Sequence, residues 1–230
     1  MVLTNHGSLG DTGKDTGFYL SEAAHPHEVF TKAGYEVVFA SPDGGFAPVD
    51  PKSLKDPDEA SSAFLKKFVS DHADSKGIKD TLALGKLKAS DYRGIFFAGG
   101  HGTMWDFRKN AELQKMTSTM FEQGATVGAV CHGPAALINV VLSDGEPLVK
   151  GRKVAGFTNR EEEAVGLTKV VPYLLETELK KKGAEFAGNS ENFKSQAVRD
   201  GQLVTGQNPA SATATAELFV EALKDSKAPK

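Results

Sequence analysis

The stretch Gly-Ala-Thr-Val-Gly-Ala-Val-Cys-His-Gly-Pro-Ala-Ala, Gly124–Ala136, decides the fold that this chain is expected to take. Its first half is a short apolar run bounded by glycines, which predicts a buried strand over Thr126–Val130. Its second half predicts a helix that begins near Gly133 and Pro134, because the fixed φ and missing N–H of proline suit the first helical position. Cys131 therefore lies at a sharp corner between the strand and the helix.

A cysteine at such a corner has a setting that favours nucleophilic chemistry. The turn holds the side chain out of the sheet, and small neighbours such as Ala129 and Gly133 let the turn close, as in the G-x-S-x-G elbow of hydrolases. We expect the free N–H groups of the following helix to lower the pKa of the thiol and to stabilise an oxyanion. The alternative is that Cys131 packs as a small buried hydrophobic residue, as free cysteines commonly do.

Composition and charge narrow the class of protein. A length of 230 residues with 40% hydrophobic and 25% charged residues is ordinary for a globular chain, and we expect one domain over residues 1–230. The net charge of −3 gives no basic surface for nucleic acid, and the single cysteine excludes an internal disulfide. No apolar run is long enough to span a bilayer and no signal peptide is evident, so a cytoplasmic location and no membrane partner are expected.

Strand patterns and helix patterns alternate along most of the chain. Strands are predicted at residues 35–40, 94–100 and 126–130, and a turn followed by a strand at 148–158. Helices are predicted at 18–34, 111–123, 170–182 and from 209 onward. This alternation predicts an α/β fold of the doubly wound type, in which helices cover both faces of a mostly parallel sheet.

Three other segments refine that picture. Residues 49–90 follow a looser pattern with a helix at 58–70 and a short one at 82–87, and we interpret them as a small cap or insertion on the domain. Asp200-Gly201 predicts a hairpin turn. Residues 1–4 look like a first strand that is either short or clipped.

Three motifs fall where predicted strands end. They are Gly99-Gly-His-Gly102, Cys131-His132 and the segment from Gly156 to Glu162. Ligands of parallel sheets bind beyond the carboxyl ends of the strands, so these motifs should converge on one pocket. The glycine spacing is not G-x-G-x-x-G, which makes a nucleotide site improbable.

Five motifs together resemble the DJ-1/PfpI superfamily, and within it the Hsp31-like glyoxalase III branch. They are Ser21-Glu-Ala-Ala-His-Pro26, Phe96-Phe-Ala-Gly-Gly-His-Gly-Thr103, Ala129-Val-Cys-His-Gly-Pro134, Gly156-Phe-Thr-Asn-Arg-Glu-Glu162 and Thr205-Gly-Gln-Asn-Pro-Ala-Ser211. The resemblance spans nearly the whole chain and implies a flavodoxin-like fold, a homodimer and no cofactor or metal. It also implies conversion of methylglyoxal to D-lactate, and of glyoxal to glycolate, without glutathione. Protein deglycase and holding-chaperone activities are described for members of this family as well.

The resemblance assigns roles to individual residues. Cys131 matches the family nucleophile, His132 the family histidine, and Glu22 the glutamate that hydrogen-bonds the cysteine sulfur. The acid that orients the histidine falls in the triplet Glu161–Glu163, and alignment of the motif favours Glu162.

The glycine-rich motif supplies the rest of the expected site. The N–H groups of Gly100 and His132 match the oxyanion hole, and Gly99 and His101 are expected to line the substrate site. His101 has an ordinary alternative role as a residue that caps a turn. Pro26 has no N–H to bond the carbonyl group of Glu22, so we expect a distorted backbone at Glu22.

The resulting hypothesis is chemistry on a small aldehyde. The Cys131 thiolate adds to the aldehyde carbon of methylglyoxal, His132 moves a proton between the two carbons, and Glu22 manages the proton on sulfur and on substrate oxygen. A carboxyl group beside a thiol should have a raised pKa, as a proton shuttle requires.

The sequence leaves two rival functions open and argues against a third. The rivals are a PfpI-type cysteine peptidase or amidase and a non-enzymatic redox-sensing chaperone in which oxidation of Cys131 is the signal. A glutamine amidotransferase needs a histidine well after its elbow cysteine, and all six histidines lie at or before His132.

Overall fold

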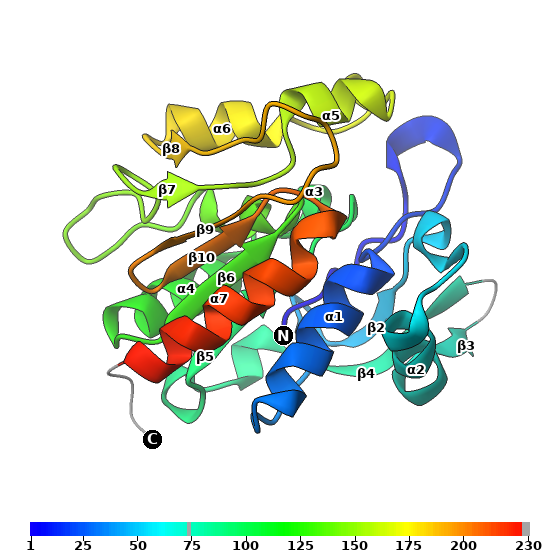
Figure 1. The fold of residues 1–230 in the computed structure, drawn as a ribbon, viewed down its shortest axis with the longest axis horizontal. Helices are drawn as coiled ribbons and strands as arrows, with labels where there is room; N and C mark the ends of the chain where they lie inside the picture. The colour runs from blue at the N-terminus through cyan, green and yellow to red at the C-terminus, as the bar shows by residue number, and fades with distance from the viewer. Residues whose placement is uncertain (73–74, 227–230) are drawn as a thin grey trace.

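The centre of the molecule is a mostly parallel sheet in the computed structural model, which describes residues 1–72 and 75–226 (Figure 1). Four of its strands lie in the spatial order β5 (Gly94–Phe97), β6 (Thr126–Val130), β10 (Leu203–Gly206) and β9 (Ala197–Asp200). The first three run parallel, and β9 runs antiparallel at the edge. The predicted strand at 126–130 is thus confirmed, and it lies buried between two neighbours.

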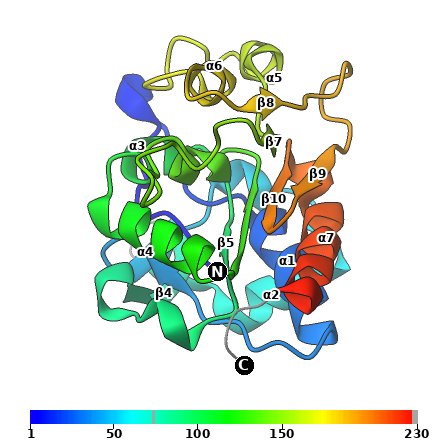
Figure 2. The same cartoon turned by 90° about the vertical axis from the view of Figure 1, so that its left-hand side faces the viewer.

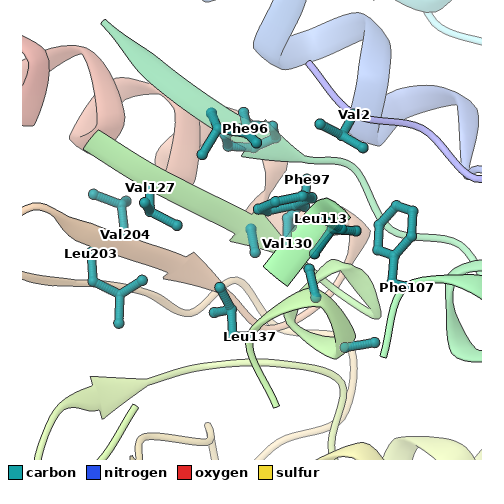
Figure 3. Close-up of a cluster of buried hydrophobic side chains, with 14 of the residues drawn as sticks. Val2, Phe96, Phe97, Phe107, Leu113, Val127, Val130, Leu137, Leu203 and Val204 are labelled. Carbon is teal, nitrogen blue, oxygen red and sulfur yellow. The ribbon is translucent and has the colours of Figure 1, made fainter. Parts of the chain in front are cut away.

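Helices cover both faces of this sheet, as the doubly wound prediction requires. Helices α1 (Leu20–Lys32) and α7 (Ala212–Asp225) pack against each other on one face, and α4 (Ala111–Glu122) lies on the opposite face (Figures 1 and 2). Buried side chains such as Phe96 and Val127 form the core between these layers (Figure 3). The predicted α/β fold class is confirmed.

A smaller layer lies beside strands β9 and β10, at the top of Figure 1. It contains α5 (Asn159–Ala164), α6 (Leu175–Lys181) and the parallel pair β7 (Lys153–Val154) and β8 (Glu185–Phe186). The short helix α3 (Thr103–Asp106) follows β5. No helix among the described residues combines the length and the apolar character needed to cross a membrane.

The predicted cap region contains strands that the sequence did not reveal. Strands β2 (Gly45–Pro48) and β3 (Ser70–His72) pair antiparallel with the long strand β4 (Ser75–Ala83), and α2 (Glu59–Phe68) confirms the helix predicted there. The side chain of Asp58 caps α2 by accepting from the Ser61 N–H group at 2.8 Å. Residues 73–74 of the predicted cap, and 227–230 of the predicted domain, lie outside the described residues. That residues 49–90 are an insertion on a single domain stays a prediction.

Short 3₁₀ turns connect many of the elements. They occupy Gly10–Thr12, Pro51–Leu54, Leu84–Lys86, Ala89–Asp91, Gly133–Leu137 and Pro209–Ser211. The helix predicted after the elbow is therefore a single 3₁₀ segment, and the helix predicted at 82–87 shrinks to three residues because Leu82 belongs to β4. The C-terminal helix was predicted from Pro209 onward, but α7 begins at Ala212, after a 3₁₀ turn in which Asn208 and Ser211 form a capping box around Pro209.

Three further predictions need correction. The helix expected at 170–182 begins only at Leu175, because Pro172 disfavours helical backbone at the residue before it. The strand expected at 148–158 shrinks to Lys153–Val154. The distortion expected at Glu22 is not seen, since α1 continues through Pro26 from its first residue to its last. The predicted hairpin is confirmed, with Gly201 at φ +60° in its turn.

The strand predicted at residues 35–40 is also wrong in extent, since only Ala40 and Ser41 form β1. The cause lies next to it. Met1 donates through its ammonium group to the Val38 carbonyl at 2.7 Å, and the Val2 N–H group donates to the Phe96 carbonyl at 2.8 Å. Val2 forms only isolated parallel bridges, to Ala40 and Phe97, and none of the described strands pairs with residues 35–39.

A cavity of about 320 Å³ lies between residues 35–38 on one side and 93–96 on the other. Its lining is mostly apolar and includes Val37 and Ile95. Burial lowers the pKa of the Met1 amine to about 5.

Candidate active site

Cys131 lies at the corner between β6 and the 3₁₀ turn that follows it. Its backbone is left-handed, with φ +59°, and only 3% of the residue is exposed. Such a conformation costs a non-glycine residue about 1–3 kcal/mol, so the surrounding structure must hold it in place. The Cys131 N–H group donates to the Gly206 carbonyl at 2.9 Å. Only glycine fits at position 133, because a Cβ atom there would lie 2.3 Å from the Phe97 carbonyl oxygen.

A chain of hydrogen bonds runs from the thiol through two side chains. Cys131 Sγ lies 3.2 Å from Nδ1 of His132, and Nε2 of His132 lies 2.8 Å from Oε2 of Glu162. The carboxylate fixes a proton on Nε2, which leaves Nδ1 free to accept from the thiol. Burial lowers the pKa of His132, with a further decrease from nearby His101. His132 is thus a neutral imidazole and can act as a base towards Cys131.

The structure separates the three glutamates of the triplet. Glu162 contacts His132, whereas Glu163 is exposed. Glu161 is buried and accepts hydrogen bonds from four other residues. These donors are Thr158, Phe193, Gln207 and Asn208. Burial alone would raise the pKa of Glu161, but these hydrogen bonds lower it overall, so Glu161 is a charged structural centre.

Replacing Glu161 by alanine should therefore destabilise the fold strongly. We expect a loss of at least about 3 kcal/mol in the free energy of unfolding, because each buried donor left without an acceptor costs about 1–3 kcal/mol. Urea denaturation followed by circular dichroism measures this. Glu163→Ala is the matched control and should change stability by no more than about 0.5 kcal/mol. Equal losses in the two variants would refute the assignment.

Glu22 lies in the first turn of α1, and no part of it is exposed. Its Oε2 atom accepts from the Gly99 N–H group at 2.9 Å. Its Oε1 atom accepts from no nitrogen or oxygen in residues 1–72 and 75–226. Burial raises the pKa of Glu22 to about 8, so the carboxyl group keeps its proton at neutral pH. The raised pKa expected for this residue is present.

The thiol itself departs from expectation. Burial raises the pKa of Cys131 well above its ordinary value, and the neighbouring carboxyl group of Glu22 raises it further. The prediction of a lowered pKa is wrong, because the turn after the elbow is too short to supply a strong dipole and the thiol is desolvated. The resting thiol is protonated, and a base must remove its proton during the reaction.

The glycine-rich loop after β5 places two backbone donors near the corner. Gly100 has φ +105°, and a Cβ atom there would lie 2.3 Å from the Gly17 carbonyl oxygen, so only glycine fits. Within the part of the chain that the structure describes, the Gly100 N–H group donates to no backbone carbonyl group, and the His132 N–H group is directed at the sulfur of Cys131. The Gly99 N–H group is instead used by Glu22, so Gly99 positions that carboxyl group.

His101 makes a contact that the sequence reasoning did not predict. Its Nε2 atom lies 3.0 Å from Oε1 of Glu162, so this carboxylate bridges two histidines. The ring of Phe157 covers His132 at a centroid distance of 4.3 Å. Both contacts join residues that had been noted only as separate motifs, because sequence spacing does not tell which loops face each other.

A metal ion is one alternative use of this cluster. Ligand atoms of His101, His132 and Glu162 lie within 4.8 Å of one another. Both carboxylate oxygens already accept hydrogen bonds from the histidine rings, and an ion would have to replace these bonds. The arrangement fits a relay of hydrogen bonds better than a set of ligands directed at one centre.

Comparison with known proteins identifies the family to which the chain belongs. The model of the DJ-1/PfpI family matches residues 15–222. The chain belongs to the DJ-1/PfpI family. Similar relatives in sequence include Glyoxalase 3 of Candida albicans, at 36% identity over 97% of both chains, and the glutathione-independent glyoxalase HSP31 of Saccharomyces cerevisiae, at 34% identity over 98% of this chain and 97% of that protein.

Solved structures agree with the sequence relatives of this DJ-1/PfpI chain. The crystal structure of glyoxalase III from Candida albicans superimposes with a TM-score of 0.86 at 34% identity, over 96% of this chain and 95% of that chain. The resemblance predicted from the five motifs is therefore confirmed, together with the fold.

Proposed function

We propose that this protein is a glutathione-independent glyoxalase that converts methylglyoxal to D-lactate and glyoxal to glycolate without a cofactor. In class it is a lyase of the D-lactate dehydratase type. The observation that carries the proposal is the buried thiol of Cys131, 3.2 Å from a neutral His132 and beside the protonated carboxyl group of Glu22. The identity of 34–36% to proteins named as glyoxalases supports it.

The first step is addition of the thiol to the aldehyde. His132 accepts the thiol proton through Nδ1, and Glu162 stabilises the imidazolium that forms. The sulfur bonds to the aldehyde carbon, and the carbonyl oxygen gains the electron pair. The N–H groups of Gly100 and His132 stabilise this oxyanion. The His132 imidazolium then returns the proton to this oxygen, which gives the hemithioacetal and leaves His132 neutral.

The second step moves a hydrogen between the two carbons of the substrate. A base removes the proton from the former aldehyde carbon, the electron pair forms an enediolate, and reprotonation at the neighbouring carbon gives a thioester. In this scheme His132 carries that proton, and Glu22 donates to and accepts from substrate oxygen and sulfur. Water then attacks the thioester, which releases the hydroxy acid and regenerates the thiol, so the net reaction adds one water.

The test is incubation of the purified protein with methylglyoxal in the absence of glutathione, followed by chiral detection of D-lactate. Formation of D-lactate at a rate proportional to enzyme supports the proposal. Absence of lactate, with the fold verified by circular dichroism, contradicts it. Peptide and amide substrates assayed in parallel test the peptidase alternative.

The burial and raised pKa of Cys131 disfavour the redox-sensing alternative, because sensor thiols are exposed and rich in thiolate. A homodimer, a cytoplasmic location, and deglycase or holding-chaperone activity stay predictions.

A further inference from the structure

The carboxylate of Glu162 serves two histidines at once. Its Oε2 atom lies 2.8 Å from Nε2 of His132, and its Oε1 atom lies 3.0 Å from Nε2 of His101. The two imidazole rings are 4.1 Å apart between centroids. The side chain of His132 is 1% exposed and that of His101 is 15% exposed, so His101 is the member nearer to solvent.

The backbone prevents the two histidines from separating. The Thr103 hydroxyl group lies 2.9 Å from the carbonyl oxygen of Gly100 and 3.1 Å from that of His132. Thr103 thereby links the loop that carries His101 to the corner that carries His132. Gly100 cannot shift freely, because the Gly17 carbonyl group lies against its Cα atom.

The cluster of His101, His132 and Glu162 cannot easily hold two positive charges. Two imidazolium rings at this distance repel each other, and one carboxylate cannot neutralise both. The carboxylate of Glu162 is therefore divided between the two rings. The charged or titratable groups that face His132 are Glu162 and Glu161 from α5, His101 from the loop after β5, and the adjoining Cys131 with Glu22 from α1.

We propose that His101 is a positioning residue that shares Glu162 with His132 and so keeps His132 neutral, with Nδ1 free to accept the proton of Cys131. The proposal rests on the proposed function, in which His132 is the base. His101 touches neither the thiol nor, in this scheme, the reacting atoms. Its effect is to extend the active range of His132 towards lower pH.

The principal experiment is the pH profile of kcat/KM for methylglyoxal in wild type and in His101→Phe and His101→Asn. When Glu162 no longer shares its carboxylate with His101, His132 should gain its proton more easily, so the acid limb should move to higher pH by about one unit. A uniform loss at all pH values, with an unmoved acid limb, would show a merely structural role and overturn the proposal.

A second measurement keeps this inference separate from the proposed function. Nitrogen-15 NMR of histidine-labelled protein follows the protonation of His132 directly, and it needs no catalytic turnover. The titration of His132 should move upward in His101→Phe even if the protein forms no lactate, and an unmoved titration would reject the proposal. His25→Asn is the matched control. His25 lies on α1, away from the corner, and it also contacts a carboxylate, that of Asp58, at 2.6 Å.

Discussion

Cys131→Ala should abolish D-lactate formation from methylglyoxal while leaving the fold intact. Without sulfur at the corner no hemithioacetal can form, and loss of a covalent nucleophile costs on the order of 10⁴-fold or more in rate. Alanine removes one buried atom, so the free energy of unfolding should fall by only about 1 kcal/mol. Lactate formation over time and urea denaturation measure the two quantities on the same samples.

The matched control is Cys131→Ser, which keeps a weaker nucleophile of similar size in the same left-handed backbone. It should fold like wild type and retain at most a trace of activity. Because Cys131 is the only cysteine, loss of activity on complete alkylation of wild type reports on the same atom. Turnover of Cys131→Ala near the wild-type rate would place the chemistry elsewhere and refute the proposed mechanism.

Glu22→Gln should lower activity by about 10²–10⁴-fold, because the amide cannot exchange a proton with sulfur or substrate oxygen. The same substitution should change how stability depends on pH. The pKa of Glu22 is raised from 4.5 to about 8 by burial, so the folded chain holds a proton that the unfolded chain releases. This stabilising contribution is complete below about pH 4.5 and is lost as pH rises towards 8.

The slope in that window should be up to about 1.4 kcal/mol per pH unit in wild type, and the glutamine variant should lack it. Glutamine resembles the protonated acid in shape and keeps an acceptor for the Gly99 N–H group, so the variant should fold. Urea denaturation at pH values between 5 and 8 measures the slope. Glu28→Gln, on the same helix beside Lys32, is the control and should leave the slope unchanged. Parallel curves for wild type and Glu22→Gln would show that Glu22 is already ionised.

The elements set by local pattern could be read from the sequence. The strand at Thr126–Val130 and the turn at Cys131 follow from short-range apolar and glycine signals. Residues 35–39 carry an equally good strand pattern but form no strand, because none of the described strands pairs with them. The sequence did not predict strand β4, because pairing with its neighbouring strands rather than the pattern of its own residues makes it a strand.

The sequence predicted which residues form the site better than it predicted their protonation states. The motifs pointed to Cys131, His132 and Glu22, but the protonation of the thiol depends on how completely distant segments exclude water. The choice between Glu161 and Glu162 depends on which face of α5 meets the elbow. The bridge from Glu162 to His101 depends on two loops meeting in space, which no spacing along the chain encodes.

The left-handed backbone at Cys131 means that the most reactive residue occupies a position where glycine would be more comfortable. A glycine there would relieve the torsional strain and remove the chemistry in one substitution. The sequence that is optimal for stability and the sequence that is optimal for reaction therefore differ at this residue. Stability alone would favour glycine at this corner, so the presence of cysteine there is explained by its reaction and not by the fold.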